Sequence, residues 1–267
     1  MSQATQSHGH PPDVLYQVEQ GIATITLNRP ERYNTLTSDV ISAISTRLET
    51  LASDDAVRVL VVASTGEAFS TGHDLKEMNR EGDEIFYRQL LSDCSKMMQA
   101  IIALPQPVIA QVQGIATAAG CQLVASCDLA IAASSARFAT NGIQNGLYCA
   151  TPQVALSRVV SRKHALEMLL TGDFIDAERA AEIGLVNRVV GDEELESATA
   201  DLVSRIADKS QMAIRLGKAS YYRQAEMSLD AAYRSGAEDL VRNLVAEDGI
   251  EGLTAFVEER TPKWKDR

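Results

Sequence analysis

The chain has 267 residues, a formal net charge of −11 and a hydrophobic fraction of 45%. This length and apolar content are typical of one sizeable folded core and exclude a disordered polypeptide. The negative charge argues against nucleic acid and against an anionic membrane surface as partners. Gln122 and Asp128 interrupt the longest apolar run, so we expect no membrane span. A small anionic ligand remains compatible with this charge, because a few local lysines and arginines suffice to bind it.

The chain has four cysteines: Cys94, Cys121, Cys127 and Cys149. They form no C-x-x-C pair and have no histidine at metal-ligand spacing, so we expect free structural thiols and no metal site. Residues 1–12, which include His8 and His10, show no signal-peptide pattern and are expected to form a disordered tail. These features together predict a cytoplasmic protein.

The first part of the chain alternates between predicted strands and helices. Residues 14–18 and 22–27 alternate in polarity on either side of Gln20-Gly21 and predict a hairpin of strands. After a loop, Thr37 can cap a helix. The apolar stripe of that helix is Val40, Ile44, Leu48 and Leu51. The β-branched run at 57–64 predicts a buried strand.

The alternation continues to about residue 140. A helix with an apolar stripe follows, and its stripe residues are Phe86, Leu90, Met97 and Ile101. Pro105 and Pro107 end it, and residues 108–112 predict the next buried strand. A helix from near Ala118 and a strand at 128–133 come next.

Beyond Thr151 the pattern is mostly helical. The clearest apolar stripe is Leu229, Ala232, Tyr233, Ala237, Leu240 and Leu244. No low-complexity linker separates this part from the first, so we expect an extension of one domain and not an independent domain.

Residues 114–133, GIATAAGCQLVASCDLAIAA, carry almost no charge and consist largely of Ala, Gly, Ser and Cys. Small side chains let another backbone or a ligand come within contact distance of this backbone. The one polar interior position of this segment is Gln122, and a ligand site would give its amide a role.

Five segments of the chain together resemble the crotonase superfamily, also called the enoyl-CoA hydratase/isomerase family. These segments are GIATITLNRP, AFSTGHDLKEM, GIATAAGCQLVASCDLAIA, ALEMLLTGDFIDAERAAEIGLVNRVV and EGLTAFVEER. They follow the family's order from about residue 14 to the C-terminus. Shorter stretches, among them GHDLKEM, FATNGIQNGLYCATP and RLGKASYY, are similar to one branch within the family.

The resemblance implies an α/β fold, a crotonase (ClpP-like) spiral of ββα units with a C-terminal helical trimerisation region. On this basis residues 13–200 form the spiral core and residues 201–267 form the trimerisation region. The expected assembly is a homotrimer or homohexamer. The expected ligand is an acyl-CoA thioester, with coenzyme A as part of the substrate and no separate cofactor.

The resemblance also implies an oxyanion hole at the backbone amides of His73 and Ala119, which would bind the thioester carbonyl oxygen as it becomes an enolate. Ala119 is expected at a helix start, where N–H groups lack intrahelical partners and the helix dipole favours negative charge. Tight helix packing alone is the other interpretation of the small residues there. A hydrolytic triad through His73-Asp74 is disfavoured, since no G-x-S-x-G turn is present.

The two catalytic glutamates of family hydratases fall at Gln122 and Gly142, so neither is acidic here. An amide cannot accept a proton near neutral pH, and glycine supplies only backbone. Because positioned acid–base groups contribute roughly 10²–10⁴-fold each, ordinary hydration should be slow without a substitute. Another superfamily position for a carboxylate is Ala150. Two acids near the GHDL loop, Glu77 and Asp83, are more typical of surface helix charges.

Two further sets of residues follow from the resemblance. The expected coenzyme A contacts are Arg29, Ser70, Gly72, Asp74, Leu75, Lys76, Gly120 and Phe256, the last toward a neighbouring subunit's ligand. The expected acyl-pocket residues are Asn141, Asn145, Tyr148, Cys149 and Thr151. Within these sets Lys76 can also be read as a solvated surface lysine, and Tyr148 and Cys149 as an acid or nucleophile instead of pocket lining. Glu259 stands where the family has a base, and Arg260 or Lys263 could replace it.

Three functions are therefore compatible with the sequence. The first is an acyl-CoA enzyme, nominally a hydratase or isomerase, with an altered acid–base apparatus. The second is an acyl-CoA-binding protein without catalysis. The third is a thioesterase that uses a bound water, which Gln122 would orient.

Overall fold

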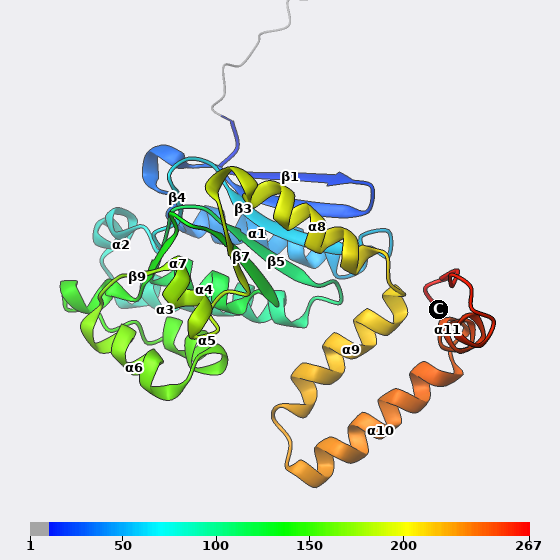
Figure 1. Ribbon diagram of the computed structural model, residues 1–267. Helices are drawn as coiled ribbons and strands as arrows, with labels where there is room; N and C mark the ends of the chain where they lie inside the picture. Colours follow the sequence, from blue (N-terminus) through cyan, green and yellow to red (C-terminus); the bar gives the residue numbers. More distant parts are fainter. Residues whose placement is uncertain (1–10) are drawn as a thin grey trace, which may run out of the picture.

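The computed structural model describes residues 11–267 (Figure 1). The expected tail, with His8 and His10, lies outside the described residues apart from Pro11 and Pro12. Two sheets form the centre of the molecule. The larger contains β1 (Val14–Glu19), β2 (Ile22–Leu27), β3 (Val59–Ser64), β5 (Val108–Val112), β7 (Leu129–Ala133) and β10 (Arg188–Val190), hydrogen-bonded in that order. All neighbours run parallel except β1 and β2, which form the predicted antiparallel hairpin.

The smaller sheet contains β4 (Ala68–Ser70), β6 (Ile115–Thr117), β8 (Arg137–Ala139) and β9 (Ile175–Asp176), again in that order. The strands β4, β6 and β8 each follow a strand of the larger sheet in the chain. The three pairs of consecutive strands are therefore β3-β4, β5-β6 and β7-β8, and each pair lies one strand further along both sheets than the pair before it. Helices follow β4 and β6, which gives the expected spiral of ββα units. The sequence did not predict the short strands, because two or three residues are too few to show alternation.

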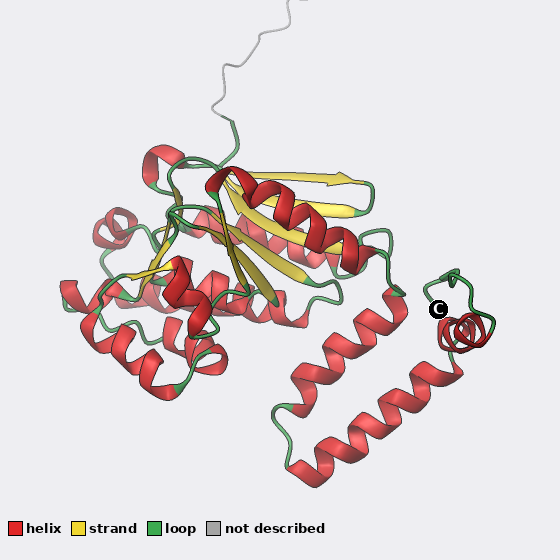
Figure 2. Ribbon diagram, viewed as in Figure 1, coloured by secondary structure: helices red, strands yellow, loops and turns green. Residues whose placement is uncertain are grey.

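Helices surround the two sheets (Figure 2). They are α1 (Ser38–Leu51), α2 (Leu75–Glu81), α3 (Glu84–Ala103), α4 (Ala119–Ser126), α5 (Pro152–Val159), α6 (Arg162–Thr171), α7 (Ala177–Glu182), α8 (Leu195–Ala207), α9 (Gln211–Gln224), α10 (Leu229–Val245) and α11 (Glu247–Val257), with single 3-10 turns η1 (Pro30–Arg32), η2 (Asn141–Asn145) and η3 (Asp192–Glu194). The predicted cap of α1 is present, since Thr37 Oγ1 accepts a hydrogen bond from Val40 N–H at 3.2 Å.

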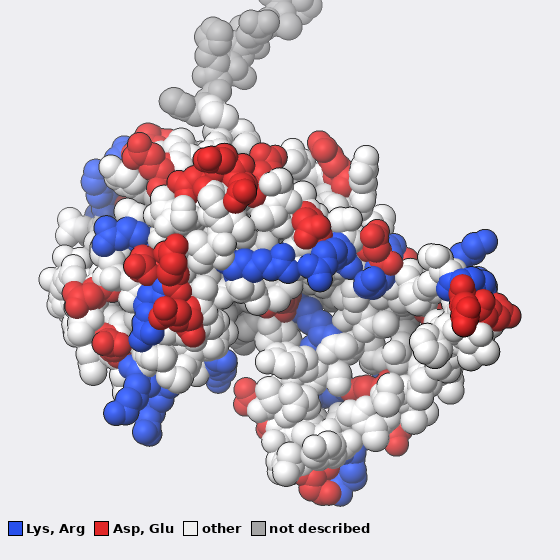
Figure 3. Space-filling model, viewed as in Figure 1, with Lys and Arg blue, Asp and Glu red and all other residues white. Residues whose placement is uncertain are grey.

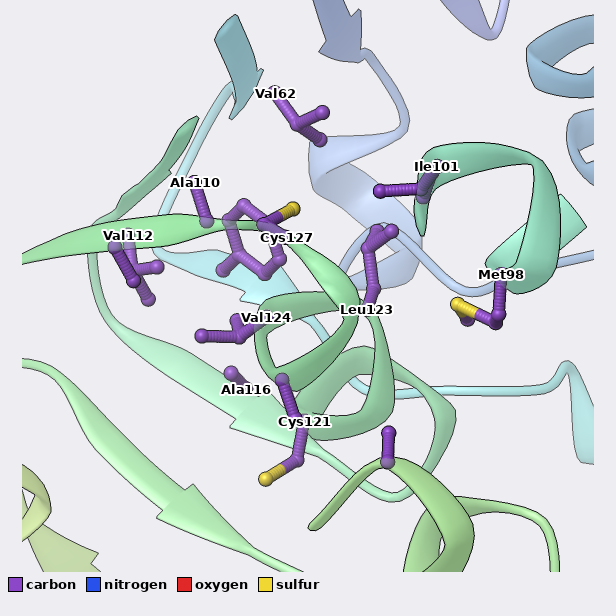
Figure 4. Close-up of a cluster of buried hydrophobic side chains, with 14 of the residues drawn as sticks. Val62, Met98, Ile101, Ala110, Val112, Ala116, Cys121, Leu123, Val124 and Cys127 are labelled. Carbon is purple, nitrogen blue, oxygen red and sulfur yellow. The ribbon is translucent and has the colours of Figure 1, made fainter. Parts of the chain in front are cut away.

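The core explains why β3 is a continuous apolar run. Leu60 and Val62 face the main core with α1, α3 and α4, whereas Val59 and Val61 face a second cluster that includes Val203 of α8. Both faces of the strand are thus covered, as expected for a parallel sheet. Figure 4 shows the main core around α4, with side chains from β3, β5, β6 and α3 packed against it.

All four cysteines are free and buried, as predicted. Burial raises the pKa of Cys94 and Cys121 to about 12, which leaves these thiols protonated and unreactive at neutral pH. Within residues 11–267, no group of three or more metal-ligating side chains comes together. No helix of the same range is long and apolar enough to cross a membrane.

The helices α9, α10 and α11 form a C-terminal arm that extends away from the two sheets (Figure 1). The buried amine of Lys218 on α9 ties the arm to the body. Its Nζ lies 2.7 Å from Asp128 Oδ2, and Tyr222 donates to the other carboxylate oxygen at 2.8 Å. The expected boundary between residues 200 and 201 falls inside α8, which packs on the larger sheet, so the arm begins at α9.

Candidate active site

A cavity of about 680 Å³ opens where the loop after β2, the start of α2, the start of α4 and the η2 segment meet. Eleven of the residues predicted from the sequence line it: His73, Asp74, Leu75, Lys76, Ala119, Asn141, Gly142, Asn145, Tyr148, Cys149 and Thr151. All five expected acyl-pocket residues are among them. The fold thus gathers three segments that are far apart in the chain around one space.

The backbone of His73 lies beside that of Ala119. A parallel bridge pairs His73 with Leu36 through Gly72 C=O and Asp74 N–H, so the N–H of His73 itself points away from Leu36. A Cβ atom placed on Gly72 would lie only 2.9 Å from the backbone nitrogen of Ala119. Among the described residues, neither N–H has a backbone or side-chain acceptor. Two neighbouring residues that line the cavity therefore each have an N–H group without an acceptor.

The backbone of Ala118 is strained. It has φ of 49° and ψ of −118°, a region that non-glycine residues rarely adopt. This conformation turns the chain from β6 directly into α4 and presents Ala119 N–H as the first free amide of that helix. Such strain costs about 1–3 kcal/mol and is typical of functional sites.

The small residues around the amides have a packing role as well. A Cβ on Gly120 would lie 2.1 Å from the carbonyl oxygen of Ser70, so only glycine lets α4 approach β4. Ser70 and Gly72 do not line the cavity, nor does Gly120. These three predicted ligand contacts therefore support the amides from behind.

The sequence reasoning missed Asn34, which is 1% exposed and holds the site together. Its Nδ2 donates to Thr65 C=O and Ala68 C=O, each at 2.8 Å, and its Oδ1 accepts from Arg29 N–H at 2.8 Å. Ser70 Oγ donates to Asn34 C=O at 2.8 Å and accepts from Gly72 N–H at 3.3 Å. The only sequence signal for this role of Asn34 is its polar side chain within the segment NRPERYNTL.

The imidazole of His73 lines the cavity, and burial lowers its pKa to about 4. It is therefore neutral at physiological pH. Its Nε2 is enclosed by protein and has no hydrogen-bond partner within residues 11–267. The hydrolytic triad that the sequence disfavours gains no support here, because no hydrogen bond joins this ring to Asp74.

Three acidic residues near the GHDL loop have structural roles. Asp74 caps α2, accepting from Lys76 N–H and Glu77 N–H, and accepts from Thr35 Oγ1 at 3.0 Å. Burial would raise the pKa of this carboxyl, but these bonds and the charge of Arg29 lower it. Glu77 accepts from the backbone N–H of Ser38, and Asp83 caps α3 through Phe86 N–H at 2.7 Å. Asp74 thus holds the loop before α2 through local hydrogen bonds.

The two positions of the missing glutamates differ in their surroundings. Gly142 lines the cavity, and a Cβ there would lie 2.4 Å from Leu147 C=O and 3.0 Å from Cys149 Sγ. Gln122 is 5% exposed and lies outside the cavity wall, with Oε1 buried and unpartnered among the described residues. Neither position offers an open place for a carboxylate.

Tyr148 and Cys149 line the cavity without any sign of activation. The Tyr148 hydroxyl donates to Gln153 Oε1 at 2.8 Å. Burial raises the pKa of the Cys149 thiol, so the thiolate is disfavoured. Their geometry favours pocket lining over acid or nucleophile roles.

The predicted coenzyme A contacts are only partly brought together. Arg29 is held in place by Asp13 at 3.2 Å and by Thr35, so its charge is already paired. Lys76 is exposed and lines both the main cavity and an adjoining polar cavity of about 340 Å³, which also contains Arg32 and Arg80.

Phe256 lies on α11, remote from the cavity and 84% exposed (Figure 1). It can meet a ligand only if another copy of the chain supplies one. Arg260, the expected substitute for a basic residue at Glu259, is paired with Glu251 and Glu258.

A family model described as Enoyl-CoA hydratase/isomerase matches residues 17–267. The chain belongs to this family. It is 44% identical over 255 residues to enoyl-CoA hydratase domain-containing protein 3, mitochondrial, of Xenopus laevis, covering 96% of this chain and 87% of that protein. It is 34% identical over 254 residues to the crotonyl-CoA hydratase of Syntrophomonas wolfei, covering 93% and 96%.

Solved structures of the family agree with the fold. The enoyl-CoA hydratase of Mycobacterium smegmatis superposes with a TM-score of 0.94 at 47% identity, over 95% of this chain and 99% of that one. Human enoyl-CoA hydratase domain-containing protein 3 gives a TM-score of 0.92 at 42% identity, over 95% and 100%. The crotonase fold is confirmed, and so is the likeness to the branch indicated by GHDLKEM and RLGKASYY.

The predicted cytoplasmic location is wrong by the same comparison. The relatives from Xenopus laevis, Rattus norvegicus, Mus musculus, Homo sapiens and Danio rerio, which match over 91–96% of this chain, are all named as mitochondrial. The prediction relied on the pattern of the four cysteines and on the composition of residues 1–12. Neither property determines the compartment of a folded enzyme.

Proposed function

We propose that this member of the enoyl-CoA hydratase/isomerase family binds an acyl-CoA thioester in the main cavity and polarises it toward the enolate. The thioester carbonyl oxygen would accept hydrogen bonds from His73 N–H and Ala119 N–H. The observation that carries the proposal is the pair of adjacent, unpartnered amides, one of them at a helix N-terminus. Fixed N–H groups of this kind stabilise developing negative charge by about 2.7–4 kcal/mol each.

Enolate chemistry suits this cavity better than the addition of water by two carboxylates. Glu31 and Asp74 are the acidic residues of its lining; Glu31 is exposed and Asp74 is bound into the loop. A thioesterase that orients water with Gln122 gains no support, because that side chain lies outside the cavity wall. The shortage of free carboxylates does favour acyl-CoA binding without catalysis as the second candidate function.

The charged part of coenzyme A would lie toward the adjoining polar cavity. Lys76 and Arg32 line both spaces, and Arg29 and Arg80 line the second, where four carboxylates also lie: Asp13, Asp39, Asp74 and Glu77. Within residues 11–267, Lys76 has no carboxylate partner, whereas Arg29 is paired. Lys76 is therefore the residue that we propose for the phosphates.

We also propose that the C-terminal arm forms the contacts of a homotrimer or homohexamer. Large apolar side chains are exposed on it, with Leu229 and Tyr233 each 75% exposed. In Figure 3 the visible surface of α9 and α10 is largely uncharged, whereas charged atoms gather at the α11 end of the arm. Apolar surface of this extent is typical of subunit contacts. Light scattering should give three or six times the chain mass, and a monomer would contradict the assembly.

The oxyanion hole is best tested by displacing one amide from behind. Gly72→Ala places a methyl group 2.9 Å from Ala119 N, at φ of 84°. Calorimetry with a non-hydrolysable acyl-CoA analogue should show saturable binding to the unaltered protein and at least tenfold weaker binding to Gly72→Ala. Gly82→Ala is the matched control, because Gly82 has φ of 59° but lies at the end of α2. Equal affinity in the Gly72 and Gly82 variants would contradict the proposed site.

A panel of acyl-CoA substrates, with assays for hydration, isomerisation and free CoA, separates the candidate functions. Isomerisation without CoA release supports enolate chemistry. Saturable binding without any turnover supports the binding protein. Release of CoA from the panel would instead identify a thioesterase.

A further inference from the structure

The imidazole of His73 has an unused ring nitrogen at the proposed carbonyl site. His73 lines the main cavity, and its Nε2 is enclosed by protein atoms. Within residues 11–267 no hydrogen bond engages Nδ1, and Nδ1 is not among the enclosed polar atoms without a partner, so it is the more accessible ring nitrogen of this cavity-lining residue. Its side chain starts from the same residue whose N–H would hold the thioester oxygen.

Other ionisable groups of the lining are engaged or unsuited to accept a proton. Asp74 accepts three hydrogen bonds, and the Tyr148 hydroxyl is bound to Gln153. The Cys149 thiol stays protonated because of burial. Lys76 is a cation, and Glu31 is exposed at the mouth of the cavity.

The basicity of His73 resembles that of a carboxylate. Burial alone accounts for a pKa of about 4, with no contribution from a charged neighbour. An ordinary glutamate has a pKa of about 4.3. A neutral imidazole at this place therefore has the same driving force for accepting a proton as a glutamate, and it needs no counter-charge in a buried site.

We propose that His73 Nδ1 is the general base of this enzyme and removes the α-proton of the bound thioester. This inference rests on the proposed function, because the acyl chain must lie with its carbonyl oxygen at His73 N–H and Ala119 N–H. The tautomer with its proton on Nε2 leaves the lone pair on Nδ1. The α-carbon is two bonds from that oxygen, and Nδ1 is four bonds from the N–H nitrogen, so covalent geometry keeps Nδ1 within a few ångströms of the amide that would hold the oxygen.

The step is balanced without another reactant. The α C–H bond breaks, its proton moves to Nδ1, and its electron pair forms the enolate double bond while the carbonyl electrons move onto oxygen. The proton then returns to the α-carbon, or to the γ-carbon of a β,γ-unsaturated chain. One base of this kind supports isomerisation and α-proton exchange, and does not supply the second group that hydration needs.

Exchange in D₂O tests this step without knowledge of the natural substrate. The unaltered protein should introduce deuterium at the α-carbon of butanoyl-CoA, as followed by mass spectrometry. His73→Gln and His73→Ala keep the backbone N–H but lose the base, so exchange should slow at least 100-fold. Affinity for the non-hydrolysable analogue should stay within about threefold. His164→Gln, at a histidine of α6 outside the cavity lining, is the matched control and should exchange normally.

The pH profile distinguishes a base from a residue that only supports the fold. Exchange by the unaltered protein should be constant above about pH 5 and fall near pH 4, as Nδ1 becomes protonated. Residual exchange in the His73 variants should lack this step. Exchange in both His73 variants at the normal rate overturns the inference. Saturable binding with no exchange by the unaltered protein overturns it too but leaves the site intact, whereas absence of binding refutes the proposed function itself.

Discussion

The side-chain amide of Asn34 lies 2.8 Å from the carbonyl oxygen of Ala68 and fixes the loop after β2 to the strand that leads to the oxyanion loop. Asn34 also has φ of 52°, a conformation that asparagine tolerates better than most residues. Its position explains how a buried loop residue, flanked by the cavity-lining Tyr33 and Thr35, can determine where His73 N–H points.

Asn34→Ala should lower the free energy of unfolding by about 2–4 kcal/mol, because it leaves buried backbone groups of Thr65, Ala68 and Arg29 unpaired. Asn28→Ala, which removes an exposed bond to Pro12 C=O and a part-buried bond from Thr65 Oγ1, should cost only about 1 kcal/mol. Chemical denaturation measures both. Similar losses in the two variants would show that Asn34 is not a central anchor.

Ala118 offers a test of the strain at the start of α4. Ala118→Gly should leave stability unchanged or raise it by up to about 1 kcal/mol, because glycine adopts φ of 49° without a steric penalty. Ala118→Val should lower stability by about 2 kcal/mol or more, because a β-branched side chain is disfavoured there. The melting temperatures of the two variants measure this difference. If Ala118→Gly lowers the melting temperature as much as Ala118→Val does, the strained geometry is refuted.

His73 should make stability depend on pH. Its pKa is about 4 in the folded chain and about 6.5 when unfolded, so the unfolded state binds more protons between these values. Stability should therefore rise with pH from 4 to 6.5, with a contribution of about 3 kcal/mol that is complete above pH 6.5 and lost below pH 4. Denaturation of His73→Gln across this range should show a flatter dependence than the unaltered protein. An unchanged slope would mean that the imidazole is not buried as a neutral group.

Glutamates at the two family positions should not create a hydratase. From the sequence alone, Gln122→Glu and Gly142→Glu restore the missing acids. In the structure, even Gly142→Ala brings a methyl group to 2.4 Å from Leu147 C=O and should lower stability by about 1–3 kcal/mol. Gln122→Glu places a carboxyl in a buried position without a partner. Gly217→Ala is the control, since a Cβ there meets nothing within 4 Å. A folded double variant that hydrates crotonyl-CoA orders of magnitude faster would contradict this account.

Much of the fold could be predicted because each long element carries its own pattern. The alternation in β1 and β2, the β-branched run of β3 and the Thr37 cap are local signals, and all are present in the structure. The short strands of the second sheet carry no local signal, since they are fixed by packing: Gly114 and Gly120 approach Glu67 and Ser70 more closely than any Cβ would allow.

The sequence predicts which residues line the candidate site, but not what each of them does there. All five acyl-pocket residues line the cavity, because they belong to one continuous segment. The predicted coenzyme A contacts agree less well with the cavity lining, because burial and ion pairing determine which residues can reach a ligand. Ser70, Gly72 and Gly120 lie behind the amides, and the charge of Arg29 is paired with Asp13. The role of Asn34 depends on bonds to residues more than 30 positions away, which no local pattern reveals.

The most direct test of the central claim is the infrared spectrum of an acyl-CoA labelled with ¹³C at its thioester carbonyl and bound to the protein. Hydrogen bonds from His73 N–H and Ala119 N–H draw electron density onto the oxygen and weaken the C=O bond. The labelled band should therefore move to lower wavenumber on binding, and the shift should be lost in Gly72→Ala but kept in Gly82→Ala. A bound ligand whose labelled band stays at its position in water would contradict the oxyanion hole.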